Sequence, residues 1–216
     1  MPLFTTIERL TQMRLIPVVR YDTADVGALA IDALIRAGFG TIEITLTMPD
    51  ALDLIREFGK RGGNDVVVGA GTIWDESTAQ RAIDAGAAYL VSPGLVPGLG
   101  AVVKSAKRAY LPGVLTPSEV AFAIREGADA VKIFPAASVG GPKHLGMLKP
   151  VFPQTLFCPT GGVNKENMHE YLASGAAMVG IGATLFSREA LLARKSVTLV
   201  NQAREHLDVL SLIPRK

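Results

Sequence analysis

Cysteine is almost absent from this sequence, which contains only Cys158 among its 216 residues. A single thiol excludes an internal disulfide and any metal cluster built from several cysteines. It also fits a reducing compartment, so we expect a cytoplasmic protein. Cys158 lies in an apolar segment, and we expect it to be a small, buried packing residue.

The chain also lacks an excess of charge of one sign, because its 22 Lys and Arg residues are nearly balanced by 20 Asp and Glu residues, which leaves a net charge of +2. The basic residues are scattered along the chain, which argues against nucleic acid or an anionic membrane as a partner. The 49% of apolar residues and the 22 glycines are typical of a globular chain with many turns. The expected ligand is therefore a small molecule.

Long uninterrupted hydrophobic runs are missing as well. Glu8 and Arg9 lie where a secretory signal peptide would need an unbroken apolar core, so we expect no export signal. Residues 85–103 form a segment without charged residues that is long enough to cross a bilayer. Pro93 and Pro97 interrupt this segment, which we interpret as a strand, a turn and the start of a helix.

Short apolar runs rich in valine and isoleucine alternate with amphipathic stretches along the whole chain. This alternation is typical of parallel strands joined by helices. Eight runs are expected to be strands: Leu15–Arg20, Thr41–Leu46, Val66–Ala70, Ala88–Ser92, Ala109–Gly113, Ala130–Phe134, Thr155–Pro159 and Met178–Gly182. Because no linker divides them, we predict an α/β fold, one (β/α)8 TIM barrel domain over residues 1–216 with an N-terminal helix.

Signals for helix starts and ends lie between these strands. Thr23 precedes a helical run at 24–37, Pro49 opens a run through Phe58, and Thr116 to Glu119 reads as a capping box. Four glycines are expected to end helices in the left-handed conformation: Gly38, Gly86, Gly127 and Gly175. The N-terminal helix is expected to cover the bottom of the barrel with Phe4, Ile7, Leu10 and Met13.

An open doubly wound sheet is the alternative architecture, but it usually carries a dinucleotide fingerprint. Two segments begin this G-x-G-x-x-G pattern at Gly69 and Gly180, and they end in Trp74 and Leu185 instead of glycine. The barrel is therefore favoured, and in a barrel the chemistry lies at the C-terminal ends of the strands.

Two charged residues, Glu43 and Lys132, lie within strands whose neighbouring residues are apolar. A buried charge destabilises the fold unless it is paired or functional. One interpretation is a structural ion pair between strands two and six. The other is catalysis: desolvation at an apolar barrel mouth favours a free lysine amine, which attacks a ketone to form an imine, while a nearby carboxylate moves protons. We expect this chemistry to need no metal and no cofactor.

A glycine-rich segment follows strand seven, where Thr160, Gly161 and Gly162 precede an expected helix start at Val163 and Asn164. Backbone N–H groups at such a helix start form a good phosphate cradle. Strand eight adds Gly182 and Ala183, and barrels often hold phosphate between the loops after strands seven and eight. The alternative is that these glycines only allow tight turns.

Six strand-end motifs, taken together, resemble those of the bacterial 2-keto-3-deoxy-6-phosphogluconate/4-hydroxy-2-oxoglutarate (KDPG/KHG) aldolases, and the resemblance covers nearly the whole chain. The motifs begin at Glu43 (Glu-Ile-Thr-Leu), Val68 (Val-Gly-Ala-Gly-Thr), Val91 (Val-Ser-Pro-Gly-Leu), Leu111 (Leu-Pro-Gly-Val-Leu-Thr-Pro), Val131 (Val-Lys-Ile-Phe-Pro) and Cys158 (Cys-Pro-Thr-Gly-Gly-Val).

The resemblance implies a class I aldolase that cleaves 2-keto-3-deoxy-6-phosphogluconate to pyruvate and glyceraldehyde 3-phosphate. It also implies a homotrimer, with Lys132 as the Schiff-base lysine and Glu43 as the proton-transferring base. The expected substrate-binding residues are Arg20, Thr72, Pro93, Phe134 and Thr160. The expected phosphate-binding residues are Gly161, Gly162, Gly182 and Ala183.

Two positions depart from the commonest family pattern. Many members have an arginine that binds the pyruvyl carboxylate where this chain has Thr47, and Arg20 could supply the missing cation. A phosphate-binding serine is usual where this chain has Ala183.

Several other functions remain as alternatives. The substrate could instead be the galactonate epimer or 4-hydroxy-2-oxoglutarate, which would give pyruvate and glyoxylate. A phosphate-binding barrel isomerase or synthase would share the glycine loops but has no need of Lys132, and a catalytically lapsed trimeric scaffold would need neither charge. The histidines at 144, 169 and 206 are expected to have surface or capping roles.

Overall fold

The computed structural model describes residues 5–63 and 65–215. Its eight strands follow one another along the chain with at least one helix between successive strands, and α1 comes before the first strand. The strands are β1 (Leu15–Val19), β2 (Thr41–Thr45), β3 (Val67–Gly71), β4 (Tyr89–Ser92), β5 (Ala109–Val114), β6 (Val131–Ile133), β7 (Phe157–Pro159) and β8 (Val179–Ile181). All eight predicted strands are thus present, most of them shorter than expected by one or two residues at an end.

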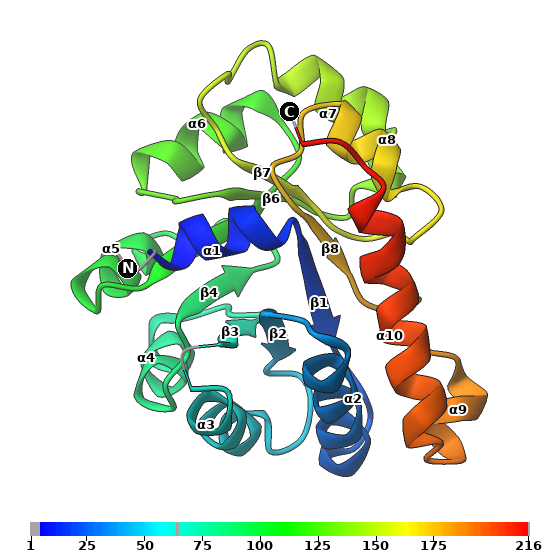
Figure 1. Cartoon of the computed structure of the whole chain (residues 1–216). Coiled ribbons are helices and arrows are strands. Elements are labelled where there is room, and N and C mark those ends of the chain that lie inside the picture. The colour runs from blue at the N-terminus through cyan, green and yellow to red at the C-terminus, as the bar shows by residue number, and fades with distance from the viewer. Residues whose placement is uncertain (1–4, 64, 216) are drawn as a thin grey trace.

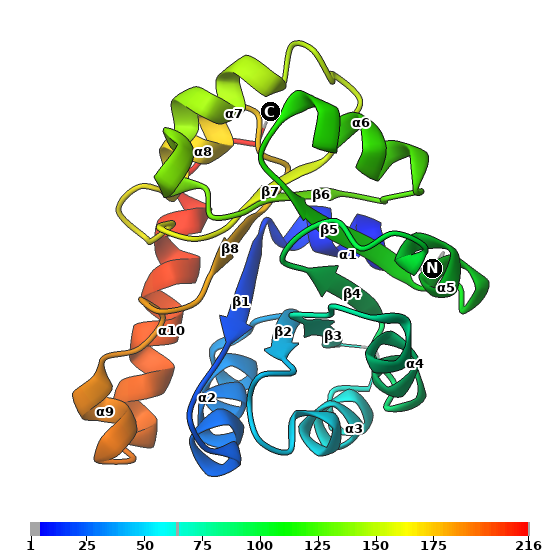
Figure 2. The same ribbon diagram turned by 180° about the vertical axis from the view of Figure 1, so that it is seen from behind.

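The strands form one parallel sheet in the order β7-β6-β5-β4-β3-β2-β1-β8. Two isolated parallel bridges, Phe157 with Ala176 and Thr160 with Gly180, join the edge strands β7 and β8. The sheet therefore closes on itself as a nearly complete barrel, and the predicted (β/α)8 fold is confirmed. Figures 1 and 2 show the strands at the centre with the helices around them.

The helices alternate with the strands in sequence. They are α1 (Thr6–Met13), α2 (Ala24–Ala37), α3 (Ala51–Arg61), α4 (Glu76–Asp84), α5 (Leu99–Ser105), α6 (Pro117–Arg125), the 3-10 helix η1 (Ala137–Val139), α7 (Pro142–Leu148), α8 (Met168–Ala173), α9 (Arg188–Leu192) and α10 (Ser196–Ser211). Among the described residues, no helix combines the length and the hydrophobicity that a membrane span requires.

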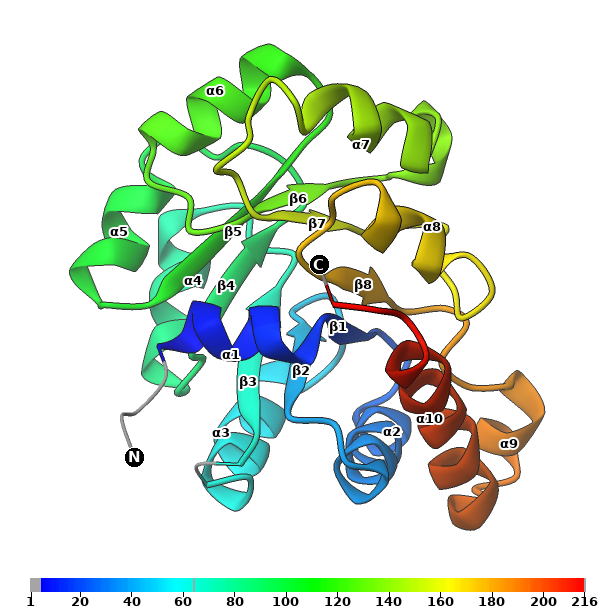
Figure 3. The same ribbon diagram turned by 45° about the horizontal axis from the view of Figure 1, so that its top comes forward.

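The hydrophobic core consists of two clusters, one inside the barrel and one between the barrel and the surrounding helices. Strand residues that point outward pack with the surrounding helices in the larger cluster. The inward residues form the smaller cluster, which includes Tyr89 of β4, Leu111 of β5 and Cys158 of β7. Leu10 of α1 belongs to this inner cluster, so α1 closes the N-terminal end of the barrel, as Figure 3 shows. Phe4, expected on the same helix, lies outside the described residues.

Most local signals in the sequence have the predicted structural effect. The Thr23 and Thr116 side chains accept hydrogen bonds at the starts of α2 and α6, and Glu119 completes the capping box. The four glycines expected to end helices all have positive φ. The predicted start of α3 at Pro49 was wrong, because Asp50 has left-handed backbone angles and α3 begins only at Ala51.

Candidate active site

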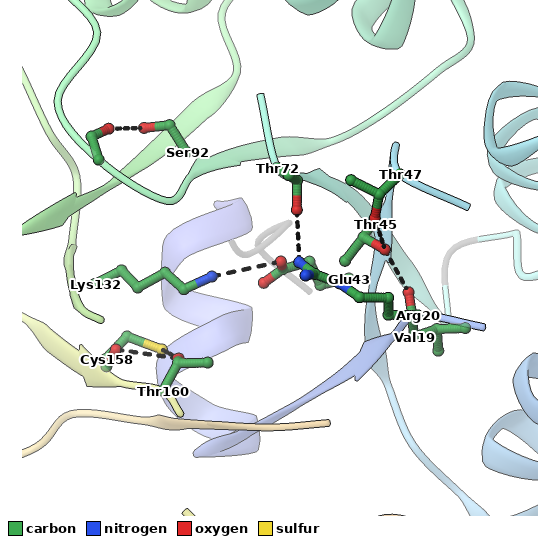
Figure 4. A network of polar contacts seen from close by, with 11 residues as sticks. Val19, Arg20, Glu43, Thr45, Thr47, Thr72, Ser92, Lys132, Cys158 and Thr160 are labelled. Carbon is green, nitrogen blue, oxygen red and sulfur yellow. Dashed lines mark hydrogen bonds and ion pairs between the residues drawn. The ribbon is translucent and has the colours of Figure 1, made fainter. Parts of the chain in front are cut away.

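Glu43 of β2 and Lys132 of β6 point toward each other across the inside of the barrel, as Figure 4 shows. Lys132 Nζ lies 3.7 Å from Glu43 Oε1, and their side chains are only 6% and 4% exposed. Glu43 Oε1 has no hydrogen-bond partner among the described residues. The two charges that the sequence places in separate apolar strands therefore form one buried acid–amine pair.

A cavity of about 370 Å³ opens above this pair at the C-terminal ends of the strands. Its size is typical of a small-molecule site. The lining residues come from the ends of β1, β6, β7 and β8: Val18, Arg20, Tyr21, Lys132, Phe134, Thr160, Gly161, Gly162, Val163, Asn164, Gly182, Ala183 and Thr184. Lys132 therefore lies at the wall of a cavity, where its amine can meet a ligand.

Phe134 provides an apolar wall beside the amine, because Lys132 Nζ lies 4.9 Å from the centre of its ring. Thr160, on the adjacent strand end, is buried, and its hydroxyl lies 3.4 Å from the Cys158 carbonyl oxygen, to which it donates. Cys158 is paired in register with Lys132. Burial raises the pKa of the Cys158 thiol to about 12, so the thiol stays protonated, as expected of a packing residue.

Arg20 reaches the site from the end of β1. Its Nη2 donates a hydrogen bond of 2.8 Å to the hydroxyl of Thr72, which follows β3 and has a positive φ of 64°. Thr47, which follows β2, donates its hydroxyl to that of Thr45 and lines a neighbouring groove instead of this cavity. A guanidinium thus lies at the cavity mouth although position 47 is threonine.

The loop after β7 brings Gly161 and Gly162 to the cavity in left-handed conformations, with φ of 88° and 82°. The predicted helix start at Val163 and Asn164 was wrong, since α8 begins at Met168. The side chains of Asn164 and Asn167 each accept the backbone N–H of the other at 2.9 Å, which stabilises a turn in place of a first helical turn. The Asn164 N–H therefore already has a hydrogen-bond partner within the loop.

Most of the residues predicted for the site meet at one place. Arg20, Lys132, Phe134 and Thr160 line the cavity, together with the four residues predicted to bind phosphate, Gly161, Gly162, Gly182 and Ala183. Glu43 lies beside the lysine. Thr72 lines a neighbouring groove, and its hydroxyl accepts a hydrogen bond from Arg20, which lines the cavity. Pro93, half-buried after β4, is not among the lining residues, and its role in binding pyruvate stays a prediction.

Sequence reasoning missed Tyr21, which also lines the cavity and follows the end of β1 by two residues, so its position could have indicated it. Asn164, which the sequence indicated only as part of an expected helix start, and Thr184, which follows β8, line the cavity as well. Burial raises the pKa of Tyr21 above its ordinary value and keeps its hydroxyl neutral.

Comparison with known proteins adds an independent observation to this geometry. The family model for KDPG and KHG aldolase matches residues 6–202. The chain belongs to the KDPG and KHG aldolase family. This family membership confirms the resemblance seen in the strand-end motifs and makes the chain an aldolase, a carbon–carbon lyase.

Similar aldolases are known from several bacteria. A 2-dehydro-3-deoxy-phosphogluconate aldolase of Pseudomonas aeruginosa is 36% identical over 199 residues, which cover 91% of this chain and 89% of that protein. A protein of the same name from Zymomonas mobilis is 39% identical over 164 residues, which cover 74% and 77%. The crystal structure of KDPG aldolase from Legionella pneumophila, with pyruvate captured at low pH as a covalent carbinolamine intermediate, has a TM-score of 0.84 at 30% identity and covers 93% of this chain and 97% of that chain.

Proposed function

We propose that this family member is a class I aldolase that cleaves 2-keto-3-deoxy-6-phosphogluconate into pyruvate and glyceraldehyde 3-phosphate, with Lys132 as the nucleophile. The observation that carries the proposal is the Lys132 amine, which faces a buried carboxylate at 3.7 Å and lines a cavity of small-molecule size. A purely structural ion pair needs no such cavity. Family membership supports the same chemistry.

The reaction follows from these two side chains. The free amine of Lys132 attacks the C2 ketone of the substrate, and the resulting carbinolamine loses water to give an imine. The protonated imine accepts the electron pair of the C3–C4 bond, while Glu43 takes the proton of the C4 hydroxyl, directly or through a water molecule. The aldehyde leaves, Glu43 returns a proton to C3 of the enamine, and hydrolysis frees pyruvate and the lysine.

The other residues lining the cavity position the substrate in this scheme. Arg20 is the cation available for the pyruvyl carboxylate, with Thr72 holding it at the mouth. Phe134 and Thr160 flank the reacting carbons. The phosphate lies between the loops at Gly161–Gly162 and Gly182–Ala183, held mainly by backbone amides because Ala183 has no hydroxyl. The same site would cleave 4-hydroxy-2-oxoglutarate with these loops unused.

The assembly in this proposal is a homotrimer, supported by the family resemblance. Light scattering should then give three times the chain mass of 22.8 kDa. The measured mass of a monomer would remove the trimer from the proposal and leave the chemistry untouched.

The decisive experiment is borohydride reduction in the presence of pyruvate. We expect one reduced pyruvyl group per chain, placed at Lys132 by peptide mapping. Lys132→Ala should lose both labelling and cleavage, because no other lysine lines the cavity among the described residues. A label on another lysine, or activity abolished by a chelator, would refute the assignment.

Glu43→Gln makes a different prediction. This variant should still be labelled, since water can supply the protons for imine formation. Its turnover should fall by about 10²–10⁴-fold, the usual contribution of a positioned acid–base group. A lactate-dehydrogenase-coupled assay of pyruvate release measures this, and unchanged turnover would remove Glu43 from proton transfer.

A further inference from the structure

β3 presents two glycines, and no larger side chain, toward the inside of the barrel at the level of the acid–amine pair. Gly69 and Gly71 are two residues apart and so share one face of the strand. On one side, Glu43 of β2 pairs in register with Gly69, and on the other side lies β4 with Tyr89. The inner face of β3 is therefore a groove between two strands that carry large side chains.

The side chains of the neighbouring strands fill this groove. A Cβ atom on Gly71 would lie 2.0 Å from Glu43 Oε1, 2.7 Å from its Cδ and 2.8 Å from its Cγ. A Cβ atom on Gly69 would lie 2.3 Å from the ring of Tyr89. Real Cβ contacts are essentially never below 3.0 Å. Glu43 thus occupies the space that any side chain at position 71 would take.

Glu43 cannot move deeper into the barrel to escape such a clash. Tyr89 is fully buried on the side of the N-terminal strand ends, and its hydroxyl is hydrogen-bonded to Thr41 at 3.1 Å. The Glu43 carboxylate would therefore have to leave the groove by about 1 Å or more.

The oxygen concerned is the one that faces the amine. Glu43 Oε1 lies 3.7 Å from Lys132 Nζ, beyond the usual N–H···O range of about 2.7–3.2 Å. The carboxylate thus occupies the space that Gly71 leaves, and in the proposed reaction this is the position from which it reaches the substrate.

We propose that Gly71 is a positioning residue for proton transfer, because its missing side chain holds the Glu43 carboxylate in place. This inference rests on the proposed role of Glu43. It differs from a general packing role in one respect: the effect of a side chain at position 71 must depend on the side chain at position 43.

The test uses Gly71→Ala and separates imine formation from proton transfer. Borohydride trapping with pyruvate reports the imine, and NMR detection of deuterium exchange at the pyruvate methyl group reports proton transfer at C3. We expect trapping to persist and exchange to fall by about 10²-fold, the loss that a 1 Å misplacement can cause. Gly59→Ala is the matched control, since a Cβ atom there meets nothing within 4 Å, and it should leave both rates unchanged.

A second measurement covers the case in which Gly71→Ala folds poorly. The melting temperature should fall in Gly71→Ala, and that fall should shrink by at least half in a Glu43→Ala background, where the clashing atoms are gone. If Gly71→Ala does not fold at all, recovery of a folded protein in the double variant supports the proposal.

Two results would overturn the inference: exchange at the wild-type rate in Gly71→Ala, or a loss of stability that is the same with and without the Glu43 side chain. Glu43→Gln is measured in parallel. If it exchanges deuterium like the wild type, the proposed role of Glu43 fails, while the stability comparison still reports the contact itself.

Discussion

Arg20 brings a cationic group from the end of β1 to the mouth of the cavity. Position 47 holds a threonine whose hydroxyl donates to Thr45 at the end of β2, and the guanidinium at the cavity mouth belongs to Arg20, directly after β1. The contact with Thr72 orients Arg20 before any ligand binds. A pre-oriented guanidinium loses less side-chain entropy when it binds a carboxylate in a two-pronged contact.

Arg20→Ala should therefore weaken pyruvate binding. We expect the dissociation constant for pyruvate, measured by calorimetry, to rise by at least about tenfold, which corresponds to roughly 1.4 kcal/mol. Arg20→Lys should give an intermediate value, because an ammonium keeps the charge and loses the planar fork. Arg125→Ala, on α6, is the control and should bind normally. A dissociation constant unaffected by Arg20→Ala would exclude Arg20 as the carboxylate anchor.

At the scale of elements, the loop between β7 and α8 differs most from the sequence prediction. The reciprocal Asn164–Asn167 bonds delay α8 to Met168, so no helix begins directly after the glycines. The cavity wall here depends on the left-handed backbone of Gly161 and Gly162. A Cβ atom on Gly162 would lie 2.3 Å from Cβ of Ala137, in η1. The loop and η1 can pack in this way only with glycine at position 162.

Gly162→Ala should damage recognition of the phosphate selectively. A clash with η1 displaces the amides that we expect to hold the phosphate, so KM for the phosphorylated substrate should rise at least about tenfold, as loss of a charge-assisted contact would predict. KM for 4-hydroxy-2-oxoglutarate should change less.

Gly86→Ala is the matched control for this experiment. Gly86 also has a left-handed backbone, with φ of 99°, and a Cβ atom there meets nothing within 4 Å. It should lower stability by roughly 1 kcal/mol through backbone strain and leave both KM values unchanged. Equal losses for the two substrates in Gly162→Ala would argue against a phosphate site in this loop.

At the scale of the whole molecule, His206 links the packing of α10 to pH. The expectation of a surface or capping role for this histidine was wrong, because it is only 2% exposed and lies in the interior of α10. Its Nδ1–H donates to the Gln202 carbonyl oxygen at 2.9 Å, and its Nε2 has no hydrogen-bond partner among the described residues. Burial lowers the pKa of His206 below its ordinary value of 6.5. The charge of Lys165 acts in the same direction, and the hydrogen bond to Gln202 and the charges of Glu205 and Glu166 oppose it.

Stability should consequently fall in mildly acidic solution. Below about pH 6.5 the unfolded chain binds a proton at His206, whereas the folded chain keeps this side chain neutral. The contribution of the neutral, buried histidine to the free energy of unfolding is therefore complete above that pH and is lost as the pH falls through the pKa of the folded state. We expect the melting temperature to drop between pH 7.5 and pH 5.5, and to drop less in His206→Gln. His169→Gln, at an exposed position, should behave like the wild type. The same drop in His206→Gln as in the wild type would show that another group is responsible.

Much of the architecture follows from local patterns. Apolar runs at regular intervals, capping residues such as Thr23 and Thr116, and helix-ending glycines predict the eight strands and several helix boundaries, because each signal acts within a few residues of itself. Glu43 and Lys132 could be singled out for the same reason: a charge inside an apolar strand is visible without knowing its neighbours in space.

The sequence by itself therefore determined the strands, their order in the chain and the two charged residues within them, since strand periodicity and helix capping are local properties. Only the tertiary structure decided that Lys132 and Glu43 lie 3.7 Å apart, that Arg20 contacts Thr72, and that Gly71 leaves the space for the carboxylate. These contacts join distant parts of the chain. Their geometry depends on the register of neighbouring strands and on the closure of the barrel, which no local pattern specifies.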